Sequence, residues 1–161
     1  MIKSILILML ATMLCHQALA STKADFVLVQ KSSRMLFVLK GNSIIEQFRI
    51  SLGKNPIGHK IKRGDNRTPE GIYTIDFRNP QSKFHYSLHI NYPNKADKAK
   101  AQQRGLNPGG DIYIHGLPNG KNFPQLYQGV DWTNGCIGLN NLQIMKLAEL
   151  VPDGTPIQII K

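Results

Sequence analysis

The distribution of hydrophobic and polar residues predicts a chain built mainly of short β-strands. Several segments rich in β-branched and aromatic residues also alternate apolar with polar positions, which is typical of strands with one buried face. The Gly-Asn pair within "KGNS" at 40–43 predicts a tight hairpin turn. The predicted strands comprise residues 26–30, 34–39, 44–51, 71–77, 84–90, 111–116 and 156–160.

Two segments have the features of helices. Residues 94–105 begin with a potential cap at Asn94 and are almost wholly polar, which predicts a short surface helix. Residues 140–151 begin with a potential cap at Asn140 and carry apolar residues at three-residue intervals, which predicts a helix packed on the core. This apolar stripe comprises Leu142, Met145, Ala148 and Val151.

Three longer segments, 53–71, 105–110 and 116–135, lack a regular pattern and are predicted to be loops. Long loops on a β scaffold often carry functional residues. The expected fold class is therefore mostly β. It is a β-sandwich or barrel-like domain with one packed C-terminal helix and a short surface helix.

Residues 1–20 differ from the rest of the chain. Lys3 precedes the apolar run "ILILMLATML", and "ALA" at 18–20 provides small residues before Ser21. These features are typical of a secretory signal peptide, with an uncleaved N-terminal anchor as the alternative. The apolar run is short for a membrane span. We therefore expect residues 21–161 to form a single domain in the periplasm or cell envelope, with no membrane span after cleavage.

The chain is strongly basic, with a formal net charge of +10, of which Lys3 contributes one. An excess of Lys and Arg favours anionic partners such as nucleic acid, anionic lipid or an anionic cell-wall polymer. Export argues against nucleic acid. The charge alone does not choose between lipid and cell wall.

Cysteine usage raises the first question of chemistry. The chain has two cysteines, and Cys15 lies in the predicted signal peptide, so Cys136 is alone in residues 21–161. An intramolecular disulfide is then excluded, although exported proteins usually pair their cysteines. Two interpretations remain, namely an inert buried thiol or a reactive nucleophile. Cys136 ends the longest loop, within "DWTNGCIGLNN".

A cysteine nucleophile requires a base and an oxyanion site. His115 ends the predicted strand "DIYIH", and Gly116 then opens the loop that leads to Cys136. His115 is therefore the candidate base, with a structural histidine as the alternative. The N–H groups of Gly135 and Cys136 are candidate oxyanion donors, and an ordinary turn glycine is the alternative for Gly135.

The other histidines and acids carry weaker signals. His85 and His89 would share one face of the predicted strand 84–90, but they lack a third ligand and acidic neighbours. No metal and no cofactor is therefore expected. Asp111 and Asp131 are candidates to orient a histidine, although neither has diagnostic spacing.

The motifs as a group resemble a known family. "IYIHG" at 112–116 followed by "TNGCIGL" at 133–139 resembles the signature of L,D-transpeptidase catalytic domains of the YkuD type. The resemblance extends over about the whole of residues 21–161. Further similar stretches are "RMLFVLKGNSIIEQFRISLGK" at 34–54, "RTPEGIYTI" at 67–75 and "VPDGTPIQI" at 151–159.

This resemblance implies a cysteine acyltransferase that acts on peptidoglycan stem peptides. Cys136 would attack the carbonyl at the L-centre of meso-diaminopimelate, release D-alanine and form a thioester that an amine then takes. His115 would be the base, with its other nitrogen held by a backbone carbonyl. Gly135 and Cys136 would supply the oxyanion N–H groups. The residues expected to position the site or its substrate are Thr133, Asn134, Gly116, Trp132 and Arg67.

Two departures from the family pattern bear on the choice of acceptor. Asn134 stands where the family often has His, and Gly138 stands where it usually has Arg. Some members of such divergent branches hydrolyse peptidoglycan linkages. A loop cation is a candidate replacement for the missing Arg, with a solvated charge run as the alternative. The loop cations are Lys60, Lys62, Arg63 and Arg67.

Three functions follow as hypotheses. The first is an L,D-transpeptidase, the second an L,D-carboxypeptidase or peptidoglycan hydrolase that uses the same cysteine, and the third a non-catalytic wall-binding module. Trp132 and Tyr127 either pack internally or line a substrate groove. Peptidoglycan stem peptides are the expected partners, nucleic acid is not expected, and a monomer is the expected state.

Overall fold

The computed structural model describes residues 23–120, 127 and 129–161. The predicted signal peptide, residues 1–20, lies outside the described residues. Within the described ranges, no helix has the length and apolar character needed to cross a membrane.

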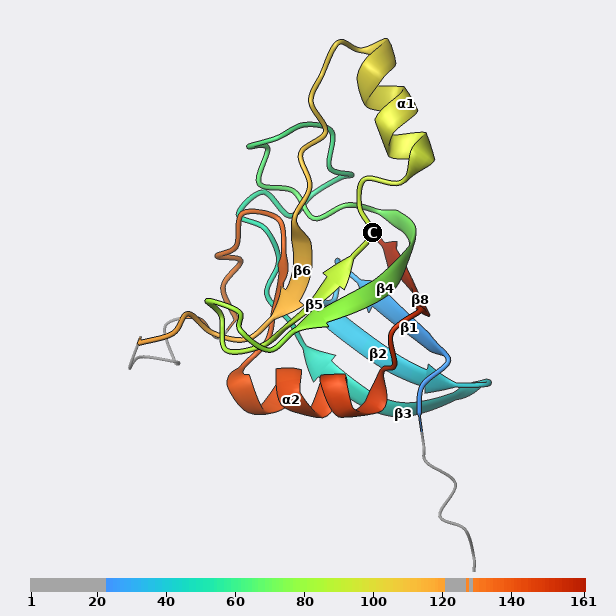
Figure 1. Ribbon diagram of the computed structural model, residues 1–161, viewed down its shortest axis with the longest axis vertical. Helices are drawn as coiled ribbons and strands as arrows, with labels where there is room; N and C mark the ends of the chain where they lie inside the picture. The colour runs from blue at the N-terminus through green and yellow to red at the C-terminus, as the bar shows by residue number, and fades with distance from the viewer. Residues whose placement is uncertain (1–22, 121–126, 128) are drawn as a thin grey trace, which may run out of the picture.

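A single mixed sheet of eight strands forms the body of the molecule (Figure 1). The strands are β1 (Phe26–Gln30), β2 (Met35–Lys40), β3 (Ser43–Arg49), β4 (Gly71–Asn79), β5 (Ser87–Ile90), β6 (Ile112–His115), β7 (Ile137–Gly138) and β8 (Thr155–Ile160). Their spatial order is β3-β2-β1-β8-β4-β5-β6-β7. The pairs β1–β8 and β6–β7 are parallel, and the other neighbours are antiparallel.

The sheet curls until its two edges meet. Strands β3 and β7 are the edges, and Ser51, just after β3, exchanges two backbone hydrogen bonds with Gly138 of β7 at 2.9 and 2.8 Å. A second bridge joins Gly53 to Thr133. The expected mostly-β, barrel-like fold is confirmed. Cys136 lies at this junction of the edges, between Thr133 and Gly138.

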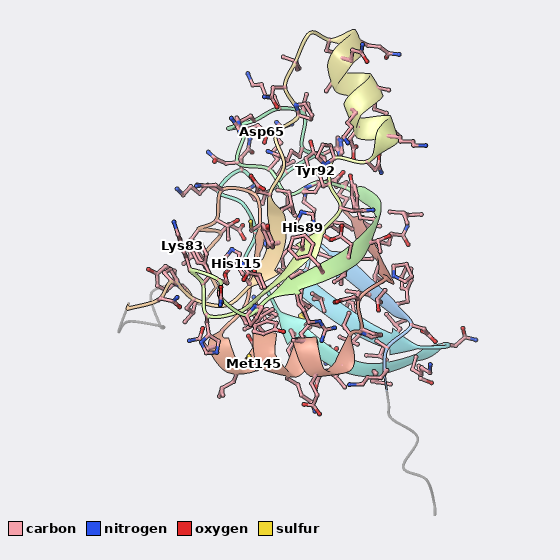
Figure 2. The ribbon with its side chains drawn as sticks, in the orientation of Figure 1. Asp65, Lys83, His89, Tyr92, His115 and Met145 are labelled. Carbon is pink, nitrogen blue, oxygen red and sulfur yellow. The ribbon has the colours of Figure 1, made fainter. Side chains whose placement is uncertain are left out.

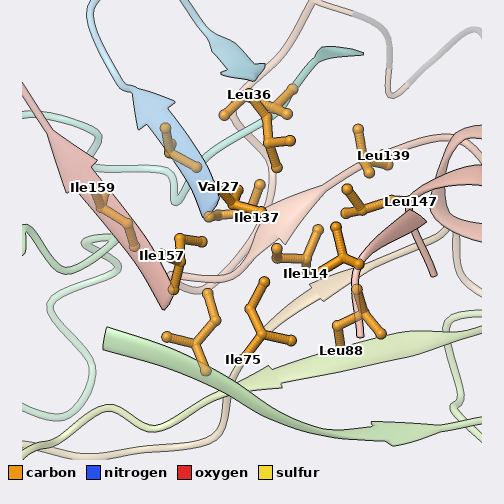
Figure 3. Packing of buried hydrophobic residues seen from close by; sticks show 14 of the residues in the cluster. Val27, Leu36, Ile75, Leu88, Ile114, Ile137, Leu139, Leu147, Ile157 and Ile159 are labelled. Atoms are coloured by element: carbon orange, nitrogen blue, oxygen red, sulfur yellow. The ribbon is translucent and has the colours of Figure 1, made fainter. Parts of the chain in front are cut away.

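Apolar side chains inside the curl form the core together with α2 (Asn141–Leu150) (Figure 3). Alternate residues of β1, β2 and β8 are buried, which matches the two-residue period of the sequence. Burial of one such side chain contributes roughly 1.5–3 kcal/mol, so the core fixes the strand register. Its members include Val27, Leu36, Ile75, Leu88, Ile114, Ile137, Leu147, Ile157 and Ile159.

Both predicted helices are present. Helix α1 (Lys95–Gln103) is mostly exposed and projects from the sheet at the top of Figure 1. Asn94 caps α1 in a reciprocal capping box with Asp97, and Asn140 caps α2 in the same way with Gln143. Because Asn140 caps it, α2 begins at Asn141, shortly after Cys136 in the chain.

The predicted apolar stripe of α2 is wrong at two positions. Leu142 is 85% exposed and Met145 is 45% exposed, whereas Ile144, Leu147 and Ala148 are buried. Figure 2 shows Met145 on α2. The reason is geometric, because residues spaced by three drift around a helix whose turn holds about 3.6 residues. The buried face follows spacings of three and four instead.

The predicted strand at 84–90 begins later, at Ser87. His85 has a φ of +65°, which lies in the left-handed region, so the extended chain starts only after it. His85 and His89 therefore do not share a strand face. His89 pairs instead with Asp76, with 2.6 Å between Nδ1 and Oδ1. Among the described residues, no group of three or more His, Cys, Asp or Glu is arranged to hold a metal.

Candidate active site

Thr133 holds the turn that presents Cys136. The Thr133 Oγ1 accepts a hydrogen bond from the Gly135 N–H at 3.1 Å and donates one to the Cys136 carbonyl at 2.7 Å. The Thr133 backbone bonds to Leu52 and Lys54 on the opposite edge, at 3.2 and 2.9 Å. The Thr133 side chain is buried. It therefore shapes the backbone of the site rather than facing a substrate.

Gly135 is required by its conformation and by its neighbour. Its φ is +129°, and a Cβ on it would lie 2.7 Å from the carbonyl oxygen of Arg67. The Gly135 N–H already donates to Thr133, whereas the Cys136 N–H donates to no group in the described part of the chain. Of the two expected oxyanion donors, Cys136 therefore has the free N–H.

The Cys136 thiol lies in a cleft of about 450 Å³. Its Sγ donates to the Asp111 carbonyl at 3.5 Å. Burial raises the pKa of the thiol. A hydrogen bond from the Tyr113 backbone and the charge of Lys60 lower the pKa, while the charge of Asp111 raises it. The net effect is upward, so the thiol stays protonated at neutral pH and would need a base to act as a nucleophile.

His115 projects from the same face of the sheet as Cys136. The register pairs Ile114 with Ile137 and His115 with Gly138. Ile114 and Ile137 point into the core, and neighbouring residues alternate between faces. His115 and Cys136 therefore both project away from the core. No hydrogen bond joins the thiol to the imidazole within the described residues, because Sγ is turned toward the start of β6.

The Gly116 carbonyl sets the tautomer of His115. Its oxygen lies 2.7 Å from Nδ1, and because a carbonyl only accepts, Nδ1 carries the hydrogen and Nε2 keeps its lone pair. His115 is 4% exposed. This burial lowers the pKa of His115, which the Gly116 hydrogen bond partly opposes. The imidazole is therefore neutral at neutral pH and basic at Nε2.

Aromatic side chains hold the imidazole in place. Phe84 lies against His115 with 4.4 Å between ring centroids, and Trp132 meets it edge-on at 5.4 Å. Tyr127 packs on Trp132 at 4.8 Å. Gly116 is needed beneath them, because a Cβ there would lie 2.9 Å from the Phe84 carbonyl. Phe84 was not predicted as a site residue, because its only signal in the sequence is its aromatic character.

The Trp132 indole lies over Gly138. A Cβ at position 138 would be 3.2 Å from Trp132 Cζ2 and 3.3 Å from Ser51 Cβ. A side chain at position 138, where an Arg was expected from the resemblance, would therefore require the Trp132 indole to shift by a few tenths of an ångström. Beside the indole is a cavity of about 230 Å³, and Arg49 is the cation among its lining residues.

Two of the four loop cations line the Cys136 cleft, namely Lys60 and Arg63. Lys62 and Arg67 line other cavities instead. The Arg67 Nη1 donates to the His59 carbonyl at 3.5 Å. Arg67 thus lies against the Cys136 turn through its backbone carbonyl, while its guanidinium points toward His59.

Asn134 and Asp131 flank the same turn. Asn134 is exposed, lines the Cys136 cleft and accepts a hydrogen bond from Lys54 Nζ at 3.3 Å. Asp131 forms an ion pair with Arg34 at 2.6 Å and accepts the Leu52 N–H at 2.9 Å. Neither Asp131 nor Asp111 hydrogen bonds to a histidine in the described residues. Asp131 instead anchors the chain after β3.

The sequence profile of the L,D-transpeptidase catalytic domain (YkuD) matches residues 24–159. A protein of Escherichia coli strain K12 named "Putative L,D-transpeptidase YafK" is 29% identical over 86 residues, which are 50% of this chain and 32% of that protein.

Two solved structures are also similar. The helical cell shape determining protein Pgp2 from Campylobacter jejuni is 27% identical with a TM-score of 0.65, over 86% of this chain and 48% of that one. Bd1075 from Bdellovibrio bacteriovorus is 29% identical with a TM-score of 0.58, over the same two shares, 86% and 48%. The chain thus spans about a third of the curated relative and about half of each solved one.

Proposed function

Because this chain belongs to the L,D-transpeptidase (YkuD) catalytic domain family, we propose that it is a cysteine acyltransferase acting on peptidoglycan stem peptides in the cell envelope. The observation that carries the proposal is that a free, half-buried thiol and a neutral imidazole lie on the same face of adjoining strands. Cys136 and His115 project from one face of adjoining strands, and the Gly116 carbonyl leaves Nε2 of His115 free to take a proton.

Acylation begins with rotation of the Cys136 side chain about χ1, which turns Sγ from the Asp111 carbonyl toward His115. Nε2 takes the thiol proton while the sulfur bonds to the carbonyl carbon at the L-centre of meso-diaminopimelate. The oxyanion accepts a hydrogen bond from the Cys136 N–H, and one such donor contributes about 3–4 kcal/mol. His115 then protonates the leaving amine, the C–N bond breaks and D-alanine departs.

The remaining thioester is resolved by a second nucleophile. An acceptor amine gives a proton to Nε2 of His115 and attacks the thioester carbonyl, and the Cys136 thiolate leaves and recovers the proton. The Gly116 carbonyl stabilises the imidazolium in both halves, because it accepts the Nδ1–H hydrogen bond that favours the charged ring.

The test is incubation with a disaccharide-tetrapeptide followed by mass spectrometry of products and of the intact protein. We expect an acyl-enzyme and release of D-alanine, both abolished in Cys136→Ala. His115→Gln should lose acylation but still react with iodoacetamide at alkaline pH, where the thiol ionises without a base. Cys136→Ala with undiminished activity would refute the mechanism.

Hydrolysis is the second candidate, with water as the acceptor. It is favoured by Gly138, which lacks the cation that the resemblance leads us to expect there, and by the Trp132 indole, which packs over this position. The same assay separates the two. Cross-linked dimers or exchange with added D-amino acids indicate transfer, whereas tripeptide alone indicates hydrolysis. A thiol that stays unreactive at every pH, with sacculus binding retained in Cys136→Ala, would support a non-catalytic wall-binding module instead.

A further inference from the structure

The cleft beside Cys136 carries charged residues of both signs. Lys60, Arg63 and Asp111 all line it, and Arg63 and Asp111 are exposed. Lys60 is buried and forms an ion pair with Asp65, with 2.8 Å between Nζ and Oδ1. Arg63 and Asp111 are therefore the two charged groups available to a ligand in this cleft.

Asp111 differs from every other acid in the molecule. Nine of the ten acidic residues form an ion pair or hydrogen bond through the carboxylate, but the Asp111 carboxylate has no such partner among the described residues. The paired acids are Asp25, Glu46, Asp65, Glu70, Asp76, Asp97, Asp131, Glu149 and Asp153. The exposed Asp111 carboxylate therefore remains available to a cationic group that enters the Cys136 cleft.

When no ligand is bound, the charge of Asp111 makes ionisation of the nearby Cys136 thiol less favourable. Its negative charge raises the pKa of Cys136 and so opposes thiolate formation. A bound cation next to Asp111 would cancel this effect. A substrate with an ammonium group at that point would therefore help to activate the thiol that attacks it.

Arg63 supplies a complementary charge from the facing loop. Its guanidinium has no hydrogen bond or ion pair with any described residue, and its backbone N–H donates to the Asn107 carbonyl at 2.8 Å. A Cβ on Gly109 would lie 3.2 Å from the Arg63 Cα. These contacts fix Arg63 against the segment that leads into Asp111. The two opposite charges thus sit on adjoining, mutually anchored loops.

We propose that Asp111 and Arg63 recognise the zwitterionic end of the diaminopimelate side chain, with Asp111 binding its ammonium and Arg63 its carboxylate. The inference rests on the proposed function, because a donor whose L-centre carbonyl reaches Cys136 carries this zwitterion only a short methylene chain away. Charge-assisted hydrogen bonds of this kind combine strength with geometric specificity. Asp111 and Arg63 are then specificity residues for the acylating substrate.

Three tetrapeptide donors separate the two contacts. They contain meso-diaminopimelate, its side-chain amide, or lysine in its place. On the first donor, Asp111→Asn and Arg63→Gln should each lower kcat/KM for acylation by roughly tenfold to a hundredfold. The amide and lysine donors lack the carboxylate but keep the ammonium. On these donors Arg63→Gln should have little effect, whereas Asp111→Asn should lower kcat/KM for acylation as much as on the first donor. Glu149→Gln and Lys62→Gln, which remove surface charges outside the cleft, serve as matched controls.

An Arg63→Gln loss that is equal on all three donors, or losses as large in the control variants, would overturn the assignment. A loss confined to the transfer step, with acylation intact, would overturn it too and place Asp111 on the acceptor side. Alkylation by neutral iodoacetamide tests for a damaged site. Asp111→Asn should react faster than the parent at neutral pH, and slower reaction would contradict the reasoning.

Binding separates this inference from the proposed chemistry. Calorimetry of the diaminopimelate tetrapeptide with Cys136→Ala needs no turnover, and adding Asp111→Asn should weaken binding by roughly tenfold or more. If the parent never acylates but binding shows this dependence, the proposed function fails and the recognition site stands. If binding does not change, the recognition site fails whatever the activity.

Discussion

Replacing Gly138 with alanine is expected to destabilise the protein through Trp132. The new Cβ would lie 3.2 Å from Trp132 Cζ2 and 3.3 Å from both Trp132 Nε1 and Ser51 Cβ, a few tenths of an ångström inside ordinary contact. The indole cannot move aside freely, because His115 and Tyr127 pack against it. The added methyl group therefore strains a well-packed site.

The contacts also give the expected loss in the free energy of unfolding for Gly138→Ala and identify Trp132 as its source. Overpacking by small groups typically costs about 1–3 kcal/mol, and for one methyl we expect about 1–2 kcal/mol, or a fall in Tm of roughly 5 °C. Trp132→Phe removes Cζ2 and Nε1, the indole atoms nearest the new Cβ. In that background, Gly138→Ala should cost much less, with a coupling energy of about 1 kcal/mol.

Urea unfolding of the parent, the two single variants and the double variant measures this coupling. Gly110→Ala is the matched control, because its Cβ would meet its nearest neighbour, Pro93 Cδ, at an ordinary 3.7 Å, and its φ is outside the left-handed region. We expect it to be neutral or slightly stabilising. Additive losses in the double variant, or an unchanged Gly138→Ala protein, would show that the indole does not fill this space.

Two further predictions concern the turn and the base. Thr133→Val should lower the free energy of unfolding by about 2–3 kcal/mol, because the buried Gly135 N–H loses its acceptor and the Cys136 carbonyl its donor. Thr133→Ser keeps the hydroxyl, so a loss as large in Thr133→Ser would contradict this account. Because burial lowers the pKa of His115, the unfolded chain takes up its proton at a higher pH than the folded protein. The free energy of unfolding should therefore fall as the pH drops below about 6.5, and His115→Gln should flatten that part of the urea-derived profile. An identical profile in His115→Gln would show that His115 does not titrate in this way.

Several elements could be predicted from local sequence because their causes are local. The Gly-Asn turn lies where predicted, with Gly41 at a φ of +56° and Lys40 paired with Ser43. Asn94 and Asn140 cap the two helices as expected, because a cap is a contact between residues three apart. Errors arose where a local pattern was ambiguous. The α2 stripe mixed two helix faces, and the left-handed His85 has no marker that distinguishes it within an alternating segment.

The two-residue strand β7 shows why the site was harder to predict than the fold. Its sequence, Ile-Gly, has no strand signal of its own, and it forms because β6 and the chain after β3 pair on its two sides. Asp111 lies beside Cys136 because β6 pairs with β7, and Phe84 lies beside His115 because β5 pairs with β6. Contacts of this kind join residues far apart in the chain, which no periodicity encodes.

The local sequence was sufficient to predict a mostly-β chain with two capped helices, a cysteine at the end of a loop and a histidine at the end of a strand. The alternation of apolar and polar residues, helix capping and turn formation each depend on residues a few positions apart, so they can be predicted from the local sequence. Long-range contacts were needed to see that Thr133 holds the Cys136 turn, that Trp132 packs over Gly138, and which loop charges line the Cys136 cleft. Those outcomes depend on how the curled sheet closes, and that closure is set by packing of the whole core rather than by any one segment.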